Sequence, residues 1–231
     1  MRSIVPAMCM SFVLIVIAAS STANEHALRC PGSGWETIGA DEQEHALICE
    51  GVAGAVSFLS SCGVASTAAA RVRVVDTLPD SCGFKAWGHF DAARDEILLG
   101  SPAICIADAT EGSFFDRLPA RVAYVSIAAH EATHAMLYAR GLGTERRLEH
   151  EYIAAVVQMQ VLPDAARDAV LAPLKIGAAV EVWKLNPLLL GLNPELFVGL
   201  AWRHFENESD SCAFIRALAE GSLRLPDYSA F

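Results

Sequence analysis

The residues whose types and spacing can do chemistry form one short run, His130-Glu131-Ala132-Thr133-His134, with the pattern H-E-x-x-H. Four residues advance an α-helix by slightly more than one turn, so both imidazoles project from one face. They can then meet at a single zinc ion about 2.0–2.1 Å from each nitrogen. Glu131 lies about 100° round the helix from His130, where it can take a proton from water at the metal. The run predicts a metal site with Glu131 as general base.

Histidines four apart also occur as ordinary core or surface residues, so a third ligand matters more than the pattern. If the helices on either side of the turn at 141–143 pack antiparallel, His134 lies seven residues before the turn and Glu151 eight after it. At about 1.5 Å per residue, both lie some 10–12 Å from the turn. Glu151 is therefore expected level with the histidines. It would complete three protein ligands and leave a fourth position for water.

Two neighbours of Glu151 are alternatives for the third ligand. Glu149 is about 200° round the helix from Glu151 and is expected on the charged, solvated face. His150 remains an alternative third ligand. Glu151 is favoured because Ala154 and Ala155 share its face, and small side chains there allow the second helix to approach the first closely.

The elements that must position these residues follow from hydrophobic periodicity and from helix-terminating residues. An amino-terminal half of mixed α and β structure is expected, with a strand at 71–77 and a β-hairpin formed by 86–90 and 96–99. The carboxyl-terminal half is expected to be a helical bundle. The expected helices span 41–60, 120–140, 144–161, 164–176, 194–206 and 210–220, with Thr144 and Asn193 as N-caps. The fold class is therefore α+β, with a small sheet and a helical carboxyl-terminal half.

The H-E-x-x-H run followed by Glu151-Tyr152-Ile153-Ala154 resembles the gluzincin metallopeptidases, whose third zinc ligand is a glutamate on the next helix, often opening an E-x-x-A motif. The resemblance covers about 87–161. It implies a zincin-like fold with a small sheet packed on the motif helix, zinc as the cofactor and a peptide or protein substrate. In that family a strand near the site pairs with extended substrate. Trp87 to Phe90 or Glu96 to Leu99 would take that part, unless they form an ordinary structural hairpin.

The chain departs from the family pattern in one place and leaves another role unassigned. Many such enzymes carry Asp or Asn soon after the third ligand, whereas Ala155 stands here, so support for the histidines must come from elsewhere. The group that would stabilise the developing oxyanion is not identified, because His204, Tyr228 and Tyr152 qualify by residue type alone. The apolar run 188–192 is expected to pack in the core rather than line a substrate pocket.

The first 23 residues have the features of an export signal: Arg2, an apolar stretch from Phe12 to Ala19, and small residues before the expected cleavage site. The apolar stretch is shorter than the roughly 20 residues of a membrane span, so cleavage is favoured over anchoring. Residues 24–231 are then one domain. Six cysteines remain, which in an exported chain indicates disulfides of undetermined pairing. The cysteines are Cys30, Cys49, Cys62, Cys82, Cys105 and Cys212.

The whole chain has a formal net charge of −10, with acidic residues scattered along it. Such a surface repels phosphate backbones, so nucleic acid is not expected as a partner. Taken together, these features predict a periplasmic or secreted zinc-dependent endopeptidase. The competing hypothesis is a non-catalytic exported protein, a binding module or an inhibitor, on a peptidase-derived scaffold. An open cleft beside Glu131 would favour the enzyme. An occluded fourth coordination position at the metal would favour the non-catalytic protein.

Overall fold

The structure, a computed structural model, describes residues 26–65, 68–78 and 87–226. Within them five strands form one mixed sheet in the order β1-β2-β3-β5-β4. Strands β2, β3 and β5 are parallel to one another, while β1 and β4 pair antiparallel with β2 and β5 at the two edges. The strands are β1 (Ala27–Arg29), β2 (Glu36–Ile38), β3 (Arg71–Val75), β4 (Gly88–Asp91) and β5 (Glu96–Gly100).

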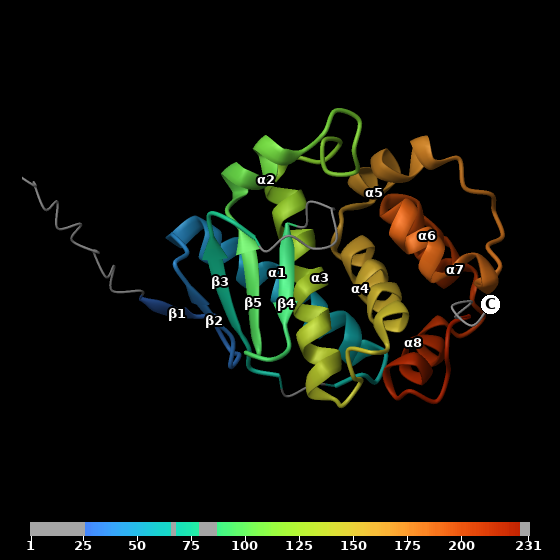
Figure 1. The fold of residues 1–231 in the computed structure, drawn as a ribbon, viewed down its shortest axis with the longest axis horizontal. Helices are drawn as coiled ribbons and strands as arrows, with labels where there is room; N and C mark the ends of the chain where they lie inside the picture. The colour runs from blue at the N-terminus through green and yellow to red at the C-terminus, as the bar shows by residue number, and fades with distance from the viewer. Residues whose placement is uncertain (1–25, 66–67, 79–86, 227–231) are drawn as a thin grey trace, which may run out of the picture.

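Helices make up the rest of the described fold. Figure 1 shows the sheet on one side of the molecule, α4, α7 and α8 on the other, and α3 between them. This arrangement confirms an α+β fold with a small sheet and a helical carboxyl-terminal half. The helices are α1 (Glu42–Ser61), α2 (Pro102–Asp108), α3 (Ala120–Ala139), α4 (Arg147–Val161), α5 (Asp164–Leu171), α6 (Pro187–Leu192), α7 (Pro194–Asn207) and α8 (Ser211–Ala219). Two 3-10 turns span Ala172–Leu174 and Val182–Lys184.

Side chains cap the amino-terminal ends of four of the described helices, α1, α6, α7 and α8. Asp41 and Glu44 form a capping box at the start of α1, and the Asn193 side chain accepts a hydrogen bond from the Leu196 amide at the start of α7. The expected start of α4 at Thr144 is wrong. The chain makes a tight turn there, with the Arg146 amide donating to the Gly143 carbonyl at 3.0 Å, so regular helix begins at Arg147.

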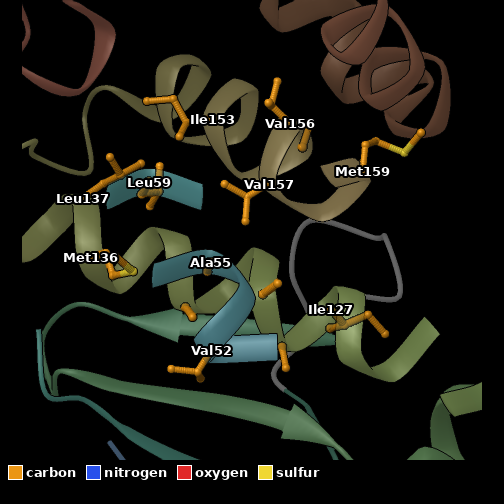
Figure 2. Close-up of a cluster of buried hydrophobic side chains, with 14 of the residues drawn as sticks. Val52, Ala55, Leu59, Ile127, Met136, Leu137, Ile153, Val156, Val157 and Met159 are labelled. Atoms are coloured by element: carbon orange, nitrogen blue, oxygen red, sulfur yellow. The ribbon is translucent and has the colours of Figure 1, made fainter. Parts of the chain in front are cut away.

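The core lies where α1, α3 and α4 meet (Figure 2). Gly51 is the reason that α1 and α3 come so close: a Cβ at this position would lie 2.5 Å from the Val125 carbonyl oxygen and 2.8 Å from the Ala128 Cβ. Glycine weakens an isolated helix, but here it lets two helix backbones touch. Close packing of these helices fixes α3, the helix that carries the H-E-x-x-H run.

Two disulfides are present among the described residues. Cys30 is bonded to Cys49, and Cys62 at the end of α1 is bonded to Cys212 on α8. The expectation of structural disulfides is confirmed for these four cysteines. Cys82 lies outside the described residues, and so do the expected export signal and Tyr228, so a third bridge and the leader stay predictions.

No helix in the described part of the chain combines the length and the apolar character needed to cross a membrane.

The expectation that the run 188–192 packs in the core is wrong for half of its leucines. Leu188 and Leu192 are 70% and 74% exposed, whereas Leu189 and Leu190 pack against the core. The run forms the short helix α6, only one face of which touches the protein. A helix this short cannot bury leucines on all sides.

Candidate metal centre

The structure brings His130 and His134 on α3 together with Glu151 on α4. The two Nε2 atoms lie 3.1 Å apart. The nearest Glu151 carboxylate oxygens lie 3.5 Å from the His130 Nε2 and 4.0 Å from the His134 Nε2. The two helices are joined by the short turn at 141–143, where Gly141 has the positive φ of 91° that ends α3.

These three donor atoms fit a divalent cation. Donors about 2.0–2.1 Å from a tetrahedral ion stand roughly 3.3–3.4 Å apart, close to the separations of 3.1 and 3.5 Å seen here. Two imidazoles and a carboxylate form a donor set that zinc accepts. The 4.0 Å separation involves the other oxygen, Oε1, so a small rotation of the Glu151 carboxylate would have to bring one oxygen near both imidazoles.

Hydrogen bonds to the other ring nitrogens orient both imidazoles. The His130 Nδ1 lies 3.1 Å from the Gln158 Oε1, an acceptor, so this nitrogen carries the proton and Nε2 keeps its lone pair. The His134 Nδ1 lies 3.4 Å from the His150 Nδ1, and the His150 Nε2 lies 3.0 Å from the Leu142 carbonyl oxygen. Because that carbonyl only accepts, His150 donates from Nε2 and accepts at Nδ1 from His134. Both ligand candidates thus present an unprotonated Nε2 to the centre.

The electrostatics of the centre favour a neutral His134 and an ionised Glu151, the forms in which these two residues bind a metal, but raise the pKa of His130. Burial lowers the pKa of His134 to about 3, which keeps this imidazole neutral. Burial raises the pKa of Glu151, but the hydrogen bond with His130 and the nearby histidines outweigh it and hold that pKa at about 2. Burial by itself would lower the pKa of His130. The hydrogen bond with the Glu151 carboxylate opposes burial, and the net effect is a raised pKa. Glu151 is therefore ionised over the whole physiological range of pH.

Glu131 lies beside the three donors but on another face of α3. It is 7% exposed, and burial raises its pKa to about 7, with His130 and a backbone hydrogen bond from Phe90 opposing the rise. Gly88 of the edge strand β4 packs directly on it, because a Cβ there would lie 2.4 Å from the Glu131 Cγ. A carboxyl group with a pKa near neutrality can both accept and return a proton.

The alternatives to Glu151 have other contacts. His150 orients His134, as described above. Glu149 was expected on the solvated face, and this expectation is wrong: it is 5% exposed and pairs with the buried Arg146 at 3.1 Å. The Leu225 amide also donates to Glu149 at 3.0 Å, because the carboxyl-terminal segment folds back over α4. Only the tertiary structure brings that segment there.

Two residues considered for oxyanion stabilisation contact each other instead. The Tyr152 hydroxyl lies 2.9 Å from the His204 Nδ1, and the two residues are 0% and 4% exposed. The His204 Nε2 lies 3.4 Å from the Glu208 carboxylate, so both ring nitrogens have partners. These contacts give Tyr152 and His204 a structural role between α4 and α7.

A second group of potential ligand atoms consists of Cys30, His45 and Cys49. Its two sulfur atoms are joined in a disulfide, which removes the thiolates that a metal would need. His45 accepts or donates a hydrogen bond at 2.8 Å with the Thr37 hydroxyl. In the oxidised protein this group is a disulfide with a neighbouring imidazole.

Sequence reasoning did not find the residues that support the centre. Gln158 lies seven residues after Glu151, so it shares a helix face with that ligand candidate, and this spacing was the available signal. No signal in the sequence pointed to Gly88, because its role depends on β4 crossing α3. No such signal pointed to His89 either, which helps to lower the pKa of His134.

The fold and the centre define an α+β protein with two histidines and a glutamate placed to hold a metal ion on adjacent helices. The chain belongs to DUF6639, a family of unknown function, whose match covers residues 37–227. Comparison with the curated proteins and with the solved structures gives no match.

Proposed function

We propose that this protein is a zinc-dependent hydrolase that cleaves peptide bonds, with a zincin-like fold of the gluzincin type. One observation carries the proposal: the His130, His134 and Glu151 donor atoms meet within 4.8 Å of one another, with the Glu131 carboxyl group beside them. Glu131 is a buried glutamate that forms no ion pair with the described residues, and a purely structural histidine pair does not need such a glutamate. A hydrolase needs one as its general base.

Each of these residues has its own role in the proposed reaction. His130, His134 and Glu151 would hold zinc, which supplies Lewis acidity and a lowered pKa for water. Glu131 takes a proton from the attacking water and then delivers it to the leaving amine. Burial raises its pKa to about 7 in the protein without metal, so the two protonation states are close in free energy there and the group can exchange a proton.

Strand β4 supports peptides as the substrate class. Among the described strands β4 pairs only with β5, so its other edge is unpaired and can add an extended peptide as a further strand. This edge lies at the centre, because Gly88 and Phe90 both contact Glu131. A peptide added here would run past the general base.

The compartment we propose is the periplasm or the extracellular space. Two disulfides form and persist in oxidising compartments, in agreement with the predicted leader at 1–23. The substrates would then be peptides or proteins of the cell envelope or its surroundings.

An occluded fourth coordination position would favour the competing hypothesis of a non-catalytic binding or inhibitor protein. The side chains of His130, His134 and Glu151 keep 17%, 13% and 24% exposure, so solvent reaches the centre. Structural zinc sites are closed by four protein ligands, whereas catalytic sites keep one position open. Three protein donors with residual exposure favour the enzyme.

The experiment combines metal analysis with a peptide-library digest of the purified protein. We expect one zinc ion per chain, cleavage of peptides, and loss of cleavage after chelation that returns when zinc is added. Glu131→Gln should keep the zinc and lower turnover by a factor of about 10²–10⁴, the usual contribution of a general base. Zinc-free protein, or full hydrolysis by pure Glu131→Gln protein, would contradict the proposal.

A further inference from the structure

A cavity of about 210 Å³ lies between α2, the segment that follows it and the first turns of α3. Its walls are mainly apolar and include Trp87, Ile106, Phe115 and Ala123. The rings of Trp87 and Phe115 lie 3.8 Å apart, centroid to centroid, and form one side. Ile106 is 58% exposed although it is apolar. A cavity with such walls suits a large apolar group.

Tyr124 also lines the cavity and is 1% exposed. Its hydroxyl has no hydrogen-bond partner among the described residues and is inaccessible to solvent, so the hydroxyl lies behind the wall rather than facing a bound group. Burial also raises the pKa of Tyr124, so the hydroxyl is a neutral donor.

The cavity lies on the same side of α3 as the metal centre. Ala123 precedes His130 by seven residues, two turns along one helix face, or about 10 Å. Trp87 immediately precedes Gly88, which packs on Glu131. An extended chain covers about 10 Å in three residues, so a peptide on the edge of β4 can reach from the centre to the cavity.

We infer that this cavity binds a large apolar side chain, aromatic or long aliphatic. If the protein is the hydrolase proposed above, that side chain belongs to the substrate and lies within three residues of the bond that is cleaved. The cavity then selects substrates by the apolar contacts of Trp87, Phe115 and Ile106.

Binding can be tested without hydrolysis. N-acetyl-phenylalaninamide, titrated into the full protein with and without zinc, should shift the methyl NMR signals of Ile106 and Ala123, whereas N-acetyl-alaninamide should not. Ala123→Phe fills the cavity and should weaken binding at least about tenfold, the size of a lost apolar contact. Ala53→Phe, at an exposed position of α1, is the matched control. Unshifted methyl signals, or equal binding by both variants, would overturn the inference.

A second variant guards against misfolding. Ile106 is exposed, so Ile106→Asp should fold normally and still weaken binding of the phenylalanine derivative. In the cleavage assay, peptides with phenylalanine or leucine near the cleaved bond should exceed their alanine counterparts in kcat/KM, and Ile106→Asp should reduce that preference. Binding without any cleavage would refute the hydrolase and leave the cavity assignment standing. Cleavage without apolar preference would refute the role of the cavity.

Discussion

Gln158 gives His130 a neutral hydrogen-bond partner rather than a carboxylate. A carboxylate in this position makes an imidazole more basic and a stronger ligand, whereas an amide mainly fixes its orientation. The negative charge of the proposed ligand set therefore comes from Glu151 alone. His150 acts in the same way on His134, again as a neutral group.

Replacing Gln158 tests this role at the scale of the residue. Gln158→Met keeps the length of the side chain but removes the acceptor, so His130 loses its fixed orientation. We expect zinc affinity to fall by a factor of about 10–100, measured by competition with a chelating dye. Gln160→Met, on the exposed face of the same helix, should leave the affinity unchanged. Equal affinities in both variants would refute the role of Gln158.

Among the elements, the contact between β4 and α3 positions Glu131, the proposed general base. Gly88 leaves room for the Glu131 side chain, and a Cβ there would also lie 2.7 Å from its Oε1. The strand thus sets where the carboxyl group lies, while α3 and α4 set where the three ligands lie. A substitution in β4 can therefore move the Glu131 carboxyl group without changing the affinity for metal.

Gly88→Ala should displace the Glu131 carboxyl group and lower kcat at least tenfold, with zinc affinity unchanged. In a Glu131→Gln background the same substitution should have little further effect, because residues in contact act non-additively. Gly177→Ala, where a Cβ meets nothing within 4 Å, is the control. Additive effects of Gly88→Ala and Glu131→Gln would contradict the coupling.

The buried pair of Arg146 and Glu149 attaches the carboxyl-terminal segment to α4. Arg146 also donates to the Leu223 carbonyl oxygen at 2.6 Å. Arg146→Met leaves Glu149 buried without a cation, which we expect to lower the free energy of unfolding by about 3–5 kcal/mol in urea denaturation. Arg147→Met, at an exposed position, should change it by less than about 0.5 kcal/mol. A small effect of Arg146→Met would show that the pair does not stabilise the fold.

At the scale of the whole molecule, the two disulfides close loops of very different length. Cys62 and Cys212 are 150 residues apart and join α1 to α8, whereas Cys30 and Cys49 are 19 residues apart. In the chain-entropy description, loss of the longer bridge costs about 5 kcal/mol and loss of the shorter about 3 kcal/mol. Paired serine variants compared by denaturant unfolding test this order, and a larger loss for Cys30 and Cys49 would contradict it.

Features that depend on short-range spacing could be predicted from the sequence. The hairpin, the helices at 120–140 and 194–206 and the Asn193 cap follow from local propensity and periodicity. The relation of Glu151 to the two histidines follows from counting residues on both sides of one short turn. Helix geometry is the same in every protein, so such counts carry over into space.

Features that depend on contacts between distant segments appear only in the folded structure. Burial of Glu149 requires the carboxyl-terminal segment to fold back, and the contact of Gly88 with Glu131 requires β4 to cross α3. The exposure of Leu188 and Leu192 depends on how little of α6 touches the core. These contacts result from the packing of whole elements, which no local pattern encodes.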